Sequence, residues 1–169
     1  QKYINEGYQD VVDIDLKSFF DEVEHSKVLD LIYEKVKCRQ TMQLLRRFMR
    51  APIQIEGKLH KRRKGVPQGA PLSPLLSNIL LHELDKELER RGLRYVRYAD
   101  DFSIYVRSHK AARRVGNGIF KYLKDRLSLP INREKSGIRR PLTFELLGYA
   151  FVSSYKKGKR CKYQLVVRK

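Results

Sequence analysis

The chain has 169 residues and a formal net charge of +18, from 37 Lys and Arg against 19 Asp and Glu. This length supports one ordinary hydrophobic core, so we expect a single domain covering 1–169. A positive excess this large repels itself unless a polyanion neutralises it, which favours nucleic acid as the partner. An anionic membrane surface is the competing interpretation, but there is no run of 18 apolar residues, no signal peptide and no lipidation motif. Cys38 and Cys161 are far apart, which predicts reduced thiols and a cytoplasmic protein.

The first predicted element is a strand over Asp10–Leu16, "DVVDIDL". Polar and apolar residues alternate along it, which is the period of a strand with one buried face. The alternation puts Asp13 and Asp15 on the same side of the strand.

Two helices and a small hairpin are predicted next. Ser26 is the expected N-cap of the first helix, and the second ends at Pro52. Their apolar residues at helical spacing are Val28, Leu29, Leu31, Ile32 and Val36, then Leu44, Leu45, Phe48 and Met49. The hairpin over residues 52–65 turns at Glu56-Gly57 and ends in four basic residues, Lys61 to Lys64.

The second half of the chain begins with a long helix that stops at Gly92. A hairpin, "YVRYADDFSIYV", follows over residues 95–106. Ser108 is the expected cap of another helix, which Gly116 and Gly118 weaken. Late strands are predicted in "LTFELLGYAFVSS" and "CKYQLVV", around the turn "KKGK". This order matches a split β-α-β motif, an α+β fold with helices on one face of an antiparallel sheet. The other sheet face is then free to carry chemistry.

Acidic residues at two distant places point to a metal site. In a split β-α-β layout the first strand lies beside the hairpin, so Asp15 can approach Asp100 and Asp101. Three converging carboxylates need a cation, because like charges raise one another's pKa. Their oxygens suit Mg2+, and two such ions support an in-line phosphoryl displacement. The simpler alternative is a polar turn whose aspartates bond to their own backbone.

Several ordered motifs resemble the palm motifs of reverse transcriptases. They are "DIDLKSFFDEVEH" at Asp13–His25, "GVPQGAPLSPLLSNILLHELDKEL" at Gly65–Leu88, "YADD" at Tyr98–Asp101, "LPINREKSGI" at Leu129–Ile138 and "FELLGY" at Phe144–Tyr149. The second is similar to the group II intron-encoded maturase type. The resemblance implies a reverse-transcriptase palm with a partial fingers hairpin. The N-terminal fingers motifs would precede Gln1, and the thumb would follow Lys169.

By this resemblance, Asp15, Asp100 and Asp101 are the ligands of two Mg2+ ions, with Mn2+ as a substitute. The Leu16 carbonyl is an extra ligand in this interpretation. Lys135 corresponds to a lysine that protonates departing pyrophosphate, although a lysine in a basic chain is usually solvated surface.

The resemblance also implies residues around the incoming nucleotide. Phe20 is the steric gate that fills the space of a ribose 2'-OH, although the pattern alone does not decide between Phe19 and Phe20, one of which packs in the core. Gln68 and Gly69 line the nucleotide in this interpretation, although they also form a turn that enters a helix. Tyr98 and Ala99 complete the set, and Ala99 is small enough to let the sugar pass.

Two further segments are expected to hold nucleic acid. Lys61, Arg62, Arg63 and Lys64 would contact template backbone without reading sequence. Leu147 and Gly148, in "FELLGY", would form the primer grip, although an ordinary core hairpin is an alternative interpretation of the same residues. The basic stretch Tyr155–Arg160 is either a loop that touches RNA or one that is basic for solubility.

The resemblance implies an RNA-directed DNA polymerase that extends a primer 3'-OH with dNTPs on an RNA template, and that binds its intron RNA to help splicing. Two alternatives stay open. One is an RNA-binding maturase module with dispensable polymerisation, and the other is a retron or CRISPR-associated reverse transcriptase. The isolated segment is expected to be inactive.

Overall fold

The structure, a computed structural model, describes residues 1–156 and 159–168. The chain divides into two compact units. The sheet unit comprises Gln1–Asp15, Leu88–Phe120 and Asn132–Lys169, and the helical unit comprises Leu16–Glu87 and Lys121–Ile131. The expectation of one domain over 1–169 stays a prediction.

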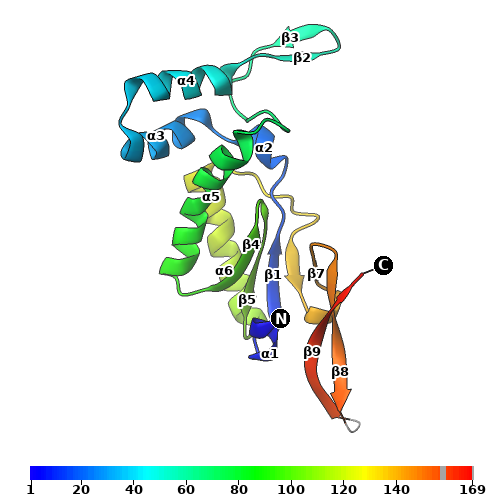
Figure 1. The fold of residues 1–169 in the computed structure, drawn as a ribbon. Helices are drawn as coiled ribbons and strands as arrows, with labels where there is room; N and C mark the ends of the chain where they lie inside the picture. The colour runs from blue at the N-terminus through cyan, green and yellow to red at the C-terminus, as the bar shows by residue number, and fades with distance from the viewer. Residues whose placement is uncertain (157–158, 169) are drawn as a thin grey trace. The chain divides into compact units, whose positions relative to one another are not determined.

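A four-stranded antiparallel sheet forms the centre of the sheet unit (Figure 1). Its strands, in spatial order, are β4 (Arg94–Tyr98), β5 (Asp101–Val106), β1 (Asp10–Ile14) and β6 (Gly137–Arg139). In chain order β1 comes first, the β4–β5 hairpin follows, and β6 returns to the free edge of β1. This is the strand order of the split β-α-β motif, so the predicted α+β fold is confirmed.

Helix α6 (His109–Tyr122) packs on one face of this sheet. The Ser108 hydroxyl accepts a hydrogen bond from the Ala111 amide at 3.3 Å, so the predicted cap is confirmed. Gly116 is buried on the face of α6 that packs on the sheet, and a Cβ there would lie 3.4 Å from Cγ1 of Val12, which is about van der Waals contact.

The opposite face of the sheet is partly covered, contrary to the expectation of a free face. Val11 of β1 is fully buried there in a second core with Ile4, Tyr105, Phe144, Phe151 and Tyr163. Tyr105 belongs to β5 and Ile4 to α1 (Lys2–Asn5). Phe151 and Tyr163 come from a second sheet of β7 (Glu145–Leu146), β8 (Tyr149–Lys156) and β9 (Lys159–Val167), and Phe144 lies between this sheet and the 3-10 turn η2 (Pro141–Thr143). The end of this face that carries Asp13 and Asp15 is not sealed in this core, and both acids are half-buried. The predicted turn residues Lys157 and Gly158 lie outside the described residues.

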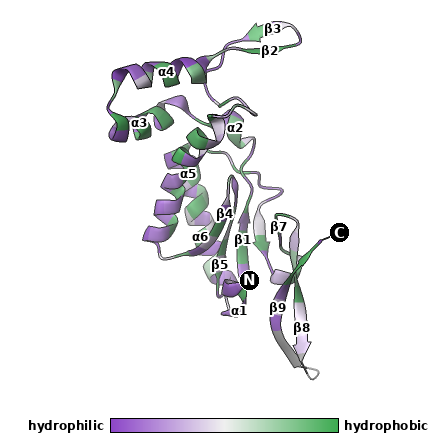
Figure 2. Cartoon of the chain, in the orientation of Figure 1, coloured by the Kyte–Doolittle hydropathy of each residue, from purple (hydrophilic) through white to green (hydrophobic). Residues whose placement is uncertain are grey.

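The helical unit contains α2 (Phe19–Glu22), α3 (His25–Val36), α4 (Arg39–Arg50) and α5 (Ser73–Arg90), which runs into the sheet unit at Leu88. The hairpin of β2 (Ile53–Ile55) and β3 (Lys58–His60) turns at Glu56 and Gly57, both with positive φ, as predicted. The π-helical turn η1 (Leu123–Leu127) also belongs to this unit. Figure 2 shows that α4 is mostly hydrophilic along its length.

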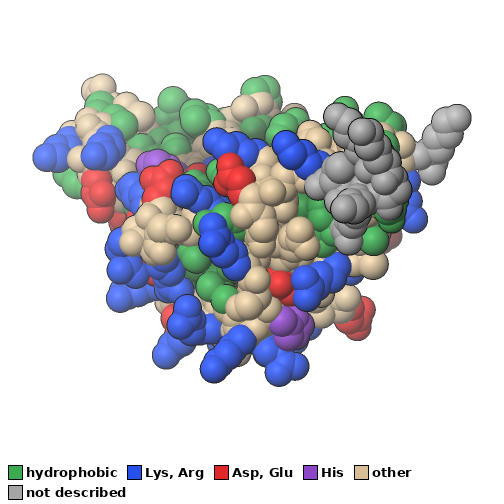
Figure 3. Space-filling view, turned by 90° about the horizontal axis from the view of Figure 1, so that it is seen from below, with side chains coloured by type: hydrophobic (Ala, Val, Ile, Leu, Met, Phe, Trp, Pro, Cys, Tyr) green, Lys and Arg blue, Asp and Glu red, His purple; other side chains and the backbone are tan. Residues whose placement is uncertain are grey.

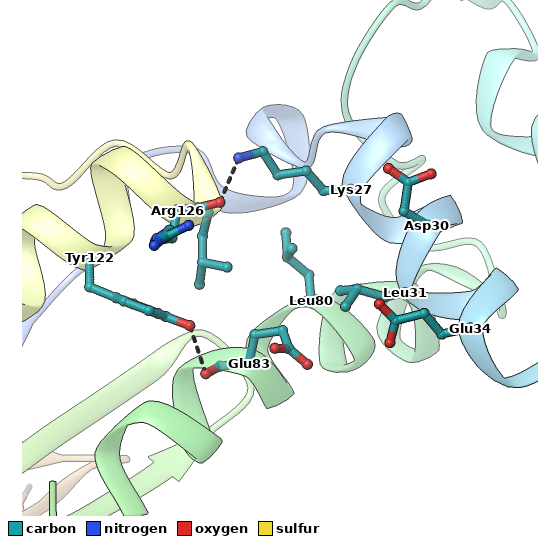
Figure 4. Close-up of a pocket in the computed structure, with 9 residues that line it drawn as sticks. Lys27, Asp30, Leu31, Glu34, Leu80, Glu83, Tyr122 and Arg126 are labelled. Atoms are coloured by element: carbon teal, nitrogen blue, oxygen red, sulfur yellow. Dashed lines mark hydrogen bonds between the residues drawn. The ribbon is translucent and has the colours of Figure 1, made fainter. Parts of the chain in front are cut away.

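Hydrogen bonds fasten η1 and its neighbours to α3 and α5 (Figure 4). The Tyr122 hydroxyl donates to the Glu83 carbonyl at 3.1 Å, and Lys27 Nζ donates to the Arg126 carbonyl at 2.5 Å. These two hydrogen bonds lie at the edge of a hollow of about 690 Å3, whose apolar lining residues are leucines, among them Leu80. Of the charged residues around it, Asp30, Glu34 and Arg126 are exposed, and Lys27 and Glu83 are half-buried.

Two local predictions about the helices are wrong. Helix α3 begins at His25 with Glu24 at the N-cap position, so Ser26 lies inside the helix. On α4 the buried residues are Met42 and Met49, while Leu44 is 68% exposed. No helix among residues 1–156 and 159–168 has both the length and the apolar character needed to cross a bilayer.

Candidate functional site

The strand register brings the early acid beside the distant doublet. The last pair of the β1–β5 ladder is Ile14 with Phe102, and one further step along the same antiparallel register places Asp15 opposite Asp101. Asp13, which pairs with Ser103, lies two residues back and therefore on the same face. All three acids line one cavity of about 240 Å3 in the sheet unit.

A tight turn presents the doublet. Tyr98 pairs with Asp101, so Ala99 and Asp100 are the two turn residues between β4 and β5. Ala99 has φ +53°, a left-handed conformation that is unfavourable for a residue with a side chain. Arg97 Nη1 donates to the Ala99 carbonyl at 2.9 Å and so supports the turn. Tyr98 and Ala99 are exposed and Asp100 is half-buried.

Two acids of this face, Asp101 and Asp13, have a raised pKa. Burial raises the pKa of Asp101, and the charges of Asp100, Asp15 and Asp13 raise it further. Burial also raises the pKa of Asp13, against the lowering effect of Arg139, whose Nε donates to Asp13 Oδ2 at 2.8 Å. Asp13 therefore already has a cation, whereas the Asp15 side chain has no ion pair within the described part of the chain.

The segment after the helices places Lys135 at the same cavity. Asp15 is bonded to this segment at both main-chain groups, since its amide donates to Ser136 Oγ at 3.0 Å and its carbonyl accepts from the Asn132 amide at 2.9 Å. The Lys135 carbonyl accepts from Arg139 Nη2 at 2.7 Å, which fixes the lysine backbone. The exposed Lys135 side chain borders the cavity with the acids.

The predicted primer grip also reaches this cavity. Leu147 and Gly148 form a two-residue turn between β7 and β8, with φ of +52° and +76°. Leu146 and Leu147 line the cavity from this turn. Sequence reasoning missed Arg139, the last residue of β6, which begins at the glycine of the "REKSG" segment.

The donor set fits a divalent cation in its chemistry. Asp15 and Asp101 are carboxylates on one face, and Asp100 is close enough to raise the pKa of Asp101. Hard oxygen ligands of this kind suit Mg2+. Among the described residues, no three His, Cys, Asp or Glu side chains are arranged closely enough to form a metal site by themselves. Water and substrate oxygens would have to complete the coordination sphere.

The other predicted site residues belong to the helical unit. Leu16 is buried and forms an isolated bridge with Ile131. In this bridge the Lys17 amide donates to the Pro130 carbonyl, so the hydrogen bond does not use the Leu16 carbonyl. Ser18 has φ +47° and begins α2, so the chain turns into a helix there. Phe19 is 3% exposed and Phe20 is half-buried. Phe19 is thus the core member of the pair, and Phe20 keeps part of its surface accessible.

The loop of Gln68 and Gly69 is exposed, and Gly69 has φ +80° with open space where a Cβ would point. Ser73 Oγ donates to the Pro67 carbonyl at 2.5 Å, which joins this loop to the start of α5. The basic segment Lys61–Lys64 lines a hollow of about 420 Å3 together with Asp21 and Ile53.

Positive charge is spread widely over the surface. Figure 3 shows Lys and Arg side chains across one face, with single acidic side chains between them. Tyr155 is 69% exposed. The side chains of the rest of the predicted basic loop, at positions 156–160, lie outside the described residues.

Comparisons with known proteins place this geometry in a class. Solved structures of telomerase share this fold. The apo telomerase from Candida tropicalis truncated from its C-terminal domain superposes with a TM-score of 0.66 at 17% identity, over 83% of this chain and 33% of that one. At this identity the likeness shows the fold alone.

The family model described as reverse transcriptase (RNA-dependent DNA polymerase) matches residues 2–151. The chain therefore belongs to the reverse transcriptase family. It is similar to the group II intron-encoded protein LtrA of Lactococcus lactis subsp. cremoris, with 44% identity over 75 residues, which is 44% of this chain and 12% of LtrA. The Retron Ec86 reverse transcriptase of Escherichia coli is 28% identical over 90% of this chain and 45% of its own length. The chain thus spans less than half of each of these relatives.

Proposed function

We propose that this chain is the palm and part of the fingers of a group II intron-type reverse transcriptase, within a longer polypeptide. The observation that carries the proposal is the strand register that sets Asp15 opposite Asp101 on a face shared with Lys135. The 44% identity to LtrA over 75 residues supports the intron type, and the retron type stays the alternative. In the complete protein the activity is extension of a primer 3'-OH with dNTPs on an RNA template.

In this proposal Asp15, Asp100 and Asp101 hold two Mg2+ ions, which Mn2+ can replace, and the Leu16 carbonyl is an additional ligand. When bound, such ions activate the attacking hydroxyl and stabilise the leaving oxygen. Burial and then the charges of the neighbouring acids raise the pKa of Asp101, and a cation would relieve that repulsion, which supports the metal assignment. Lys135, at the same cavity, protonates the departing pyrophosphate.

The remaining residues bind and orient substrates. Phe20 excludes nucleotides that carry a 2'-OH, and Gln68 and Gly69 line the incoming dNTP, where Gly69 offers an open approach to its backbone. Tyr98 and Ala99 lie beneath the sugar.

Nucleic acid is held at two places in the proposal. Leu147 and Gly148, in the tight turn at the cavity, hold the primer end. The exposed basic segment Lys61–Lys64 binds template backbone through charge, so its contribution falls steeply with salt. Intron RNA is a further partner of the complete protein, which we place in the cytoplasm of a bacterium or in an organelle.

The test is Asp100→Ala in the complete protein. We expect DNA synthesis to be lost while affinity for RNA is nearly unchanged, because the basic contacts lie elsewhere. Asp30→Ala, which removes an exposed acid on α3, is the matched control and should retain synthesis. Synthesis that survives Asp100→Ala would overturn the metal assignment.

The RNA-binding maturase alternative predicts a different result, because splicing assistance would be the main activity and the acids would be dispensable for it. Measuring splicing and primer extension with the same Asp100→Ala protein separates the two activities. The 169 residues alone are expected to bind Mg2+ and RNA weakly and to extend primers poorly, and robust extension by them would contradict that expectation.

A further inference from the structure

A buried histidine in the helical unit has no part in the proposed chemistry. His25 is 6% exposed, and its Nε2 lies 2.6 Å from the Gly65 carbonyl oxygen, 40 positions along the chain. A carbonyl oxygen only accepts, so Nε2 is the protonated nitrogen. Nδ1 is then a buried acceptor, and it has no hydrogen-bond partner among the described residues. A leucine of similar size would fill the space without this unpaired nitrogen, so packing alone does not account for the histidine.

Two more hydrogen bonds act at the same place. The Gly65 amide donates to the Val23 carbonyl and the Val66 amide donates to the Phe20 carbonyl, both at 2.7 Å. We call residues 20–25 together with 65–66 the junction. An exposed ion pair, Lys64 with Glu22 at 2.6 Å, also spans it, but exposed pairs contribute little. The buried bonds therefore hold the junction together.

The junction links the two parts of the proposed nucleotide site. Phe20 is on one side, and Gln68 and Gly69 follow two to four residues after Gly65 and Val66 on the other. Along the chain these parts are separated by α3, α4 and the β2–β3 hairpin, whose combined motion would otherwise decide how far apart they sit. A misplacement of about 1 Å in a reacting complex can cost roughly 100-fold in rate.

We propose that His25 is a positioning residue whose Nε2–H bond to Gly65 sets the distance between Phe20 and the Gln68–Gly69 loop, and thereby sets the preference for deoxynucleotides over ribonucleotides. This rests on the proposed function, because it requires Phe20 to be the gate. The side chain itself does not touch the nucleotide.

The neutral state of the histidine agrees with this role. Burial lowers the pKa of His25, and the charges of Arg50 and Arg62 lower it further, while the bond to Gly65 opposes the change. Both arginines carry positive charge toward the ring, so protonation of Nδ1 is disfavoured near neutral pH.

The experiment compares His25→Leu, His25→Gln and His25→Asn in the complete protein. Glutamine can place its Nε2 donor where the imidazole Nε2 lies, whereas asparagine is too short and leucine has no donor. His82→Leu is the matched control, since His82 is exposed on α5. Two quantities are measured: the ratio of kcat/KM for a dNTP to that for the matching rNTP, and hydrogen exchange of the Gly65 and Val66 amides.

We expect His25→Leu and His25→Asn to speed exchange at both amides and to lower the ratio about tenfold, within the range that misplacement permits. His25→Gln and His82→Leu should leave both quantities near the wild-type values. If glutamine fails as completely as leucine, or if the amides open while the ratio stays constant, the positioning role is refuted. Should leucine prevent folding, the comparison of asparagine with glutamine still decides the question.

A parallel Phe20→Ala variant separates this proposal from the gate itself. If the ratio is unchanged in Phe20→Ala, the gate assignment fails. The effect of His25 on amide exchange would then stand as a structural result, and its effect on the ratio would need another cause.

Discussion

Gly65 and Gly57 share a backbone conformation but not an environment, and this makes them a matched pair for substitution by alanine. Their φ angles are +81° and +78°. A Cβ at Gly65 would lie 2.8 Å from the Asp21 carbonyl oxygen, 2.9 Å from the Asp21 Cα and 3.0 Å from the Phe20 carbonyl oxygen. At Gly57, in the β2–β3 turn, a Cβ would meet nothing within 4 Å.

The two substitutions therefore differ by the cost of the clash. Alanine in a left-handed conformation costs about 1–2 kcal/mol at either position. At Gly65 the opposing atoms are main chain and cannot rotate away, and overpacking of this kind costs roughly 1–3 kcal/mol more. Gly65→Ala should then lower the free energy of unfolding by about 2–5 kcal/mol, and Gly57→Ala by about 1–2 kcal/mol.

Thermal unfolding followed by circular dichroism tests this difference at one scan rate and pH. For a chain of this size, 1 kcal/mol shifts Tm by roughly 2–4 °C, so the Tm of Gly65→Ala should lie about 2–12 °C below that of Gly57→Ala. Equal losses in the two variants would refute the reasoning, because they would mean that residues 20 and 21 do not press against Gly65.

Three further outcomes follow from charges and burial. Removing the Arg139 cation by Arg139→Gln should raise the pKa of Asp13 further, because the bond and charge of Arg139 now lower it; an NMR titration of the Asp13 carboxyl that shows no rise would contradict the pair. Asp100→Asn should lower the pKa of Asp101 toward its usual 3.8 by removing a like charge, and the same titration measures it. Because the pKa of His25 is lowered from 6.5 on folding, stability should be complete above about pH 6.5 and decrease as the pH falls below it; His25→Gln should show a weaker decrease in urea unfolding.

Local patterns predicted the elements that depend on neighbours in sequence. Alternation in "DVVDIDL" predicted β1, and the acid doublet between two apolar runs predicted the β4–β5 turn. The turn at Glu56-Gly57 was predictable because a tight hairpin turn needs positive φ at two adjacent positions, and a pair that contains glycine suits them. The resemblance then pointed to Asp15, Asp100, Asp101 and Lys135, and the structure places Asp15, Asp101 and Lys135 at one cavity.

Other features depend on contacts that no local pattern contains. Strand β6 is three residues long and exists because it pairs with β1, so "GIR" shows no strand period of its own. Helix α1 is four residues long, and its Asn5 side chain bonds to the Tyr163 main chain, 158 positions away. The periodicity of α4 indicated an apolar stripe, but whether Leu44 is covered depends on what packs there, and its side chain is 68% exposed.

The order of side chains along β1 explains why the site occupies one end of the sheet. On this face Val11 comes first and is sealed in the core with Tyr105 and Phe144. Asp13 is next, half-buried and neutralised by Arg139 at 2.8 Å. Asp15 is last, opposite Asp101, where the described residues supply no ion pair to it. If Asp15 stood at the position of Val11, its charge would be buried in an apolar core. That burial is strongly unfavourable unless the carboxylate is neutralised. The order of an apolar residue, a paired acid and an acid without an ion pair thus agrees with the proposed cation site at the end of the strand, beside the Ala99–Asp100 turn.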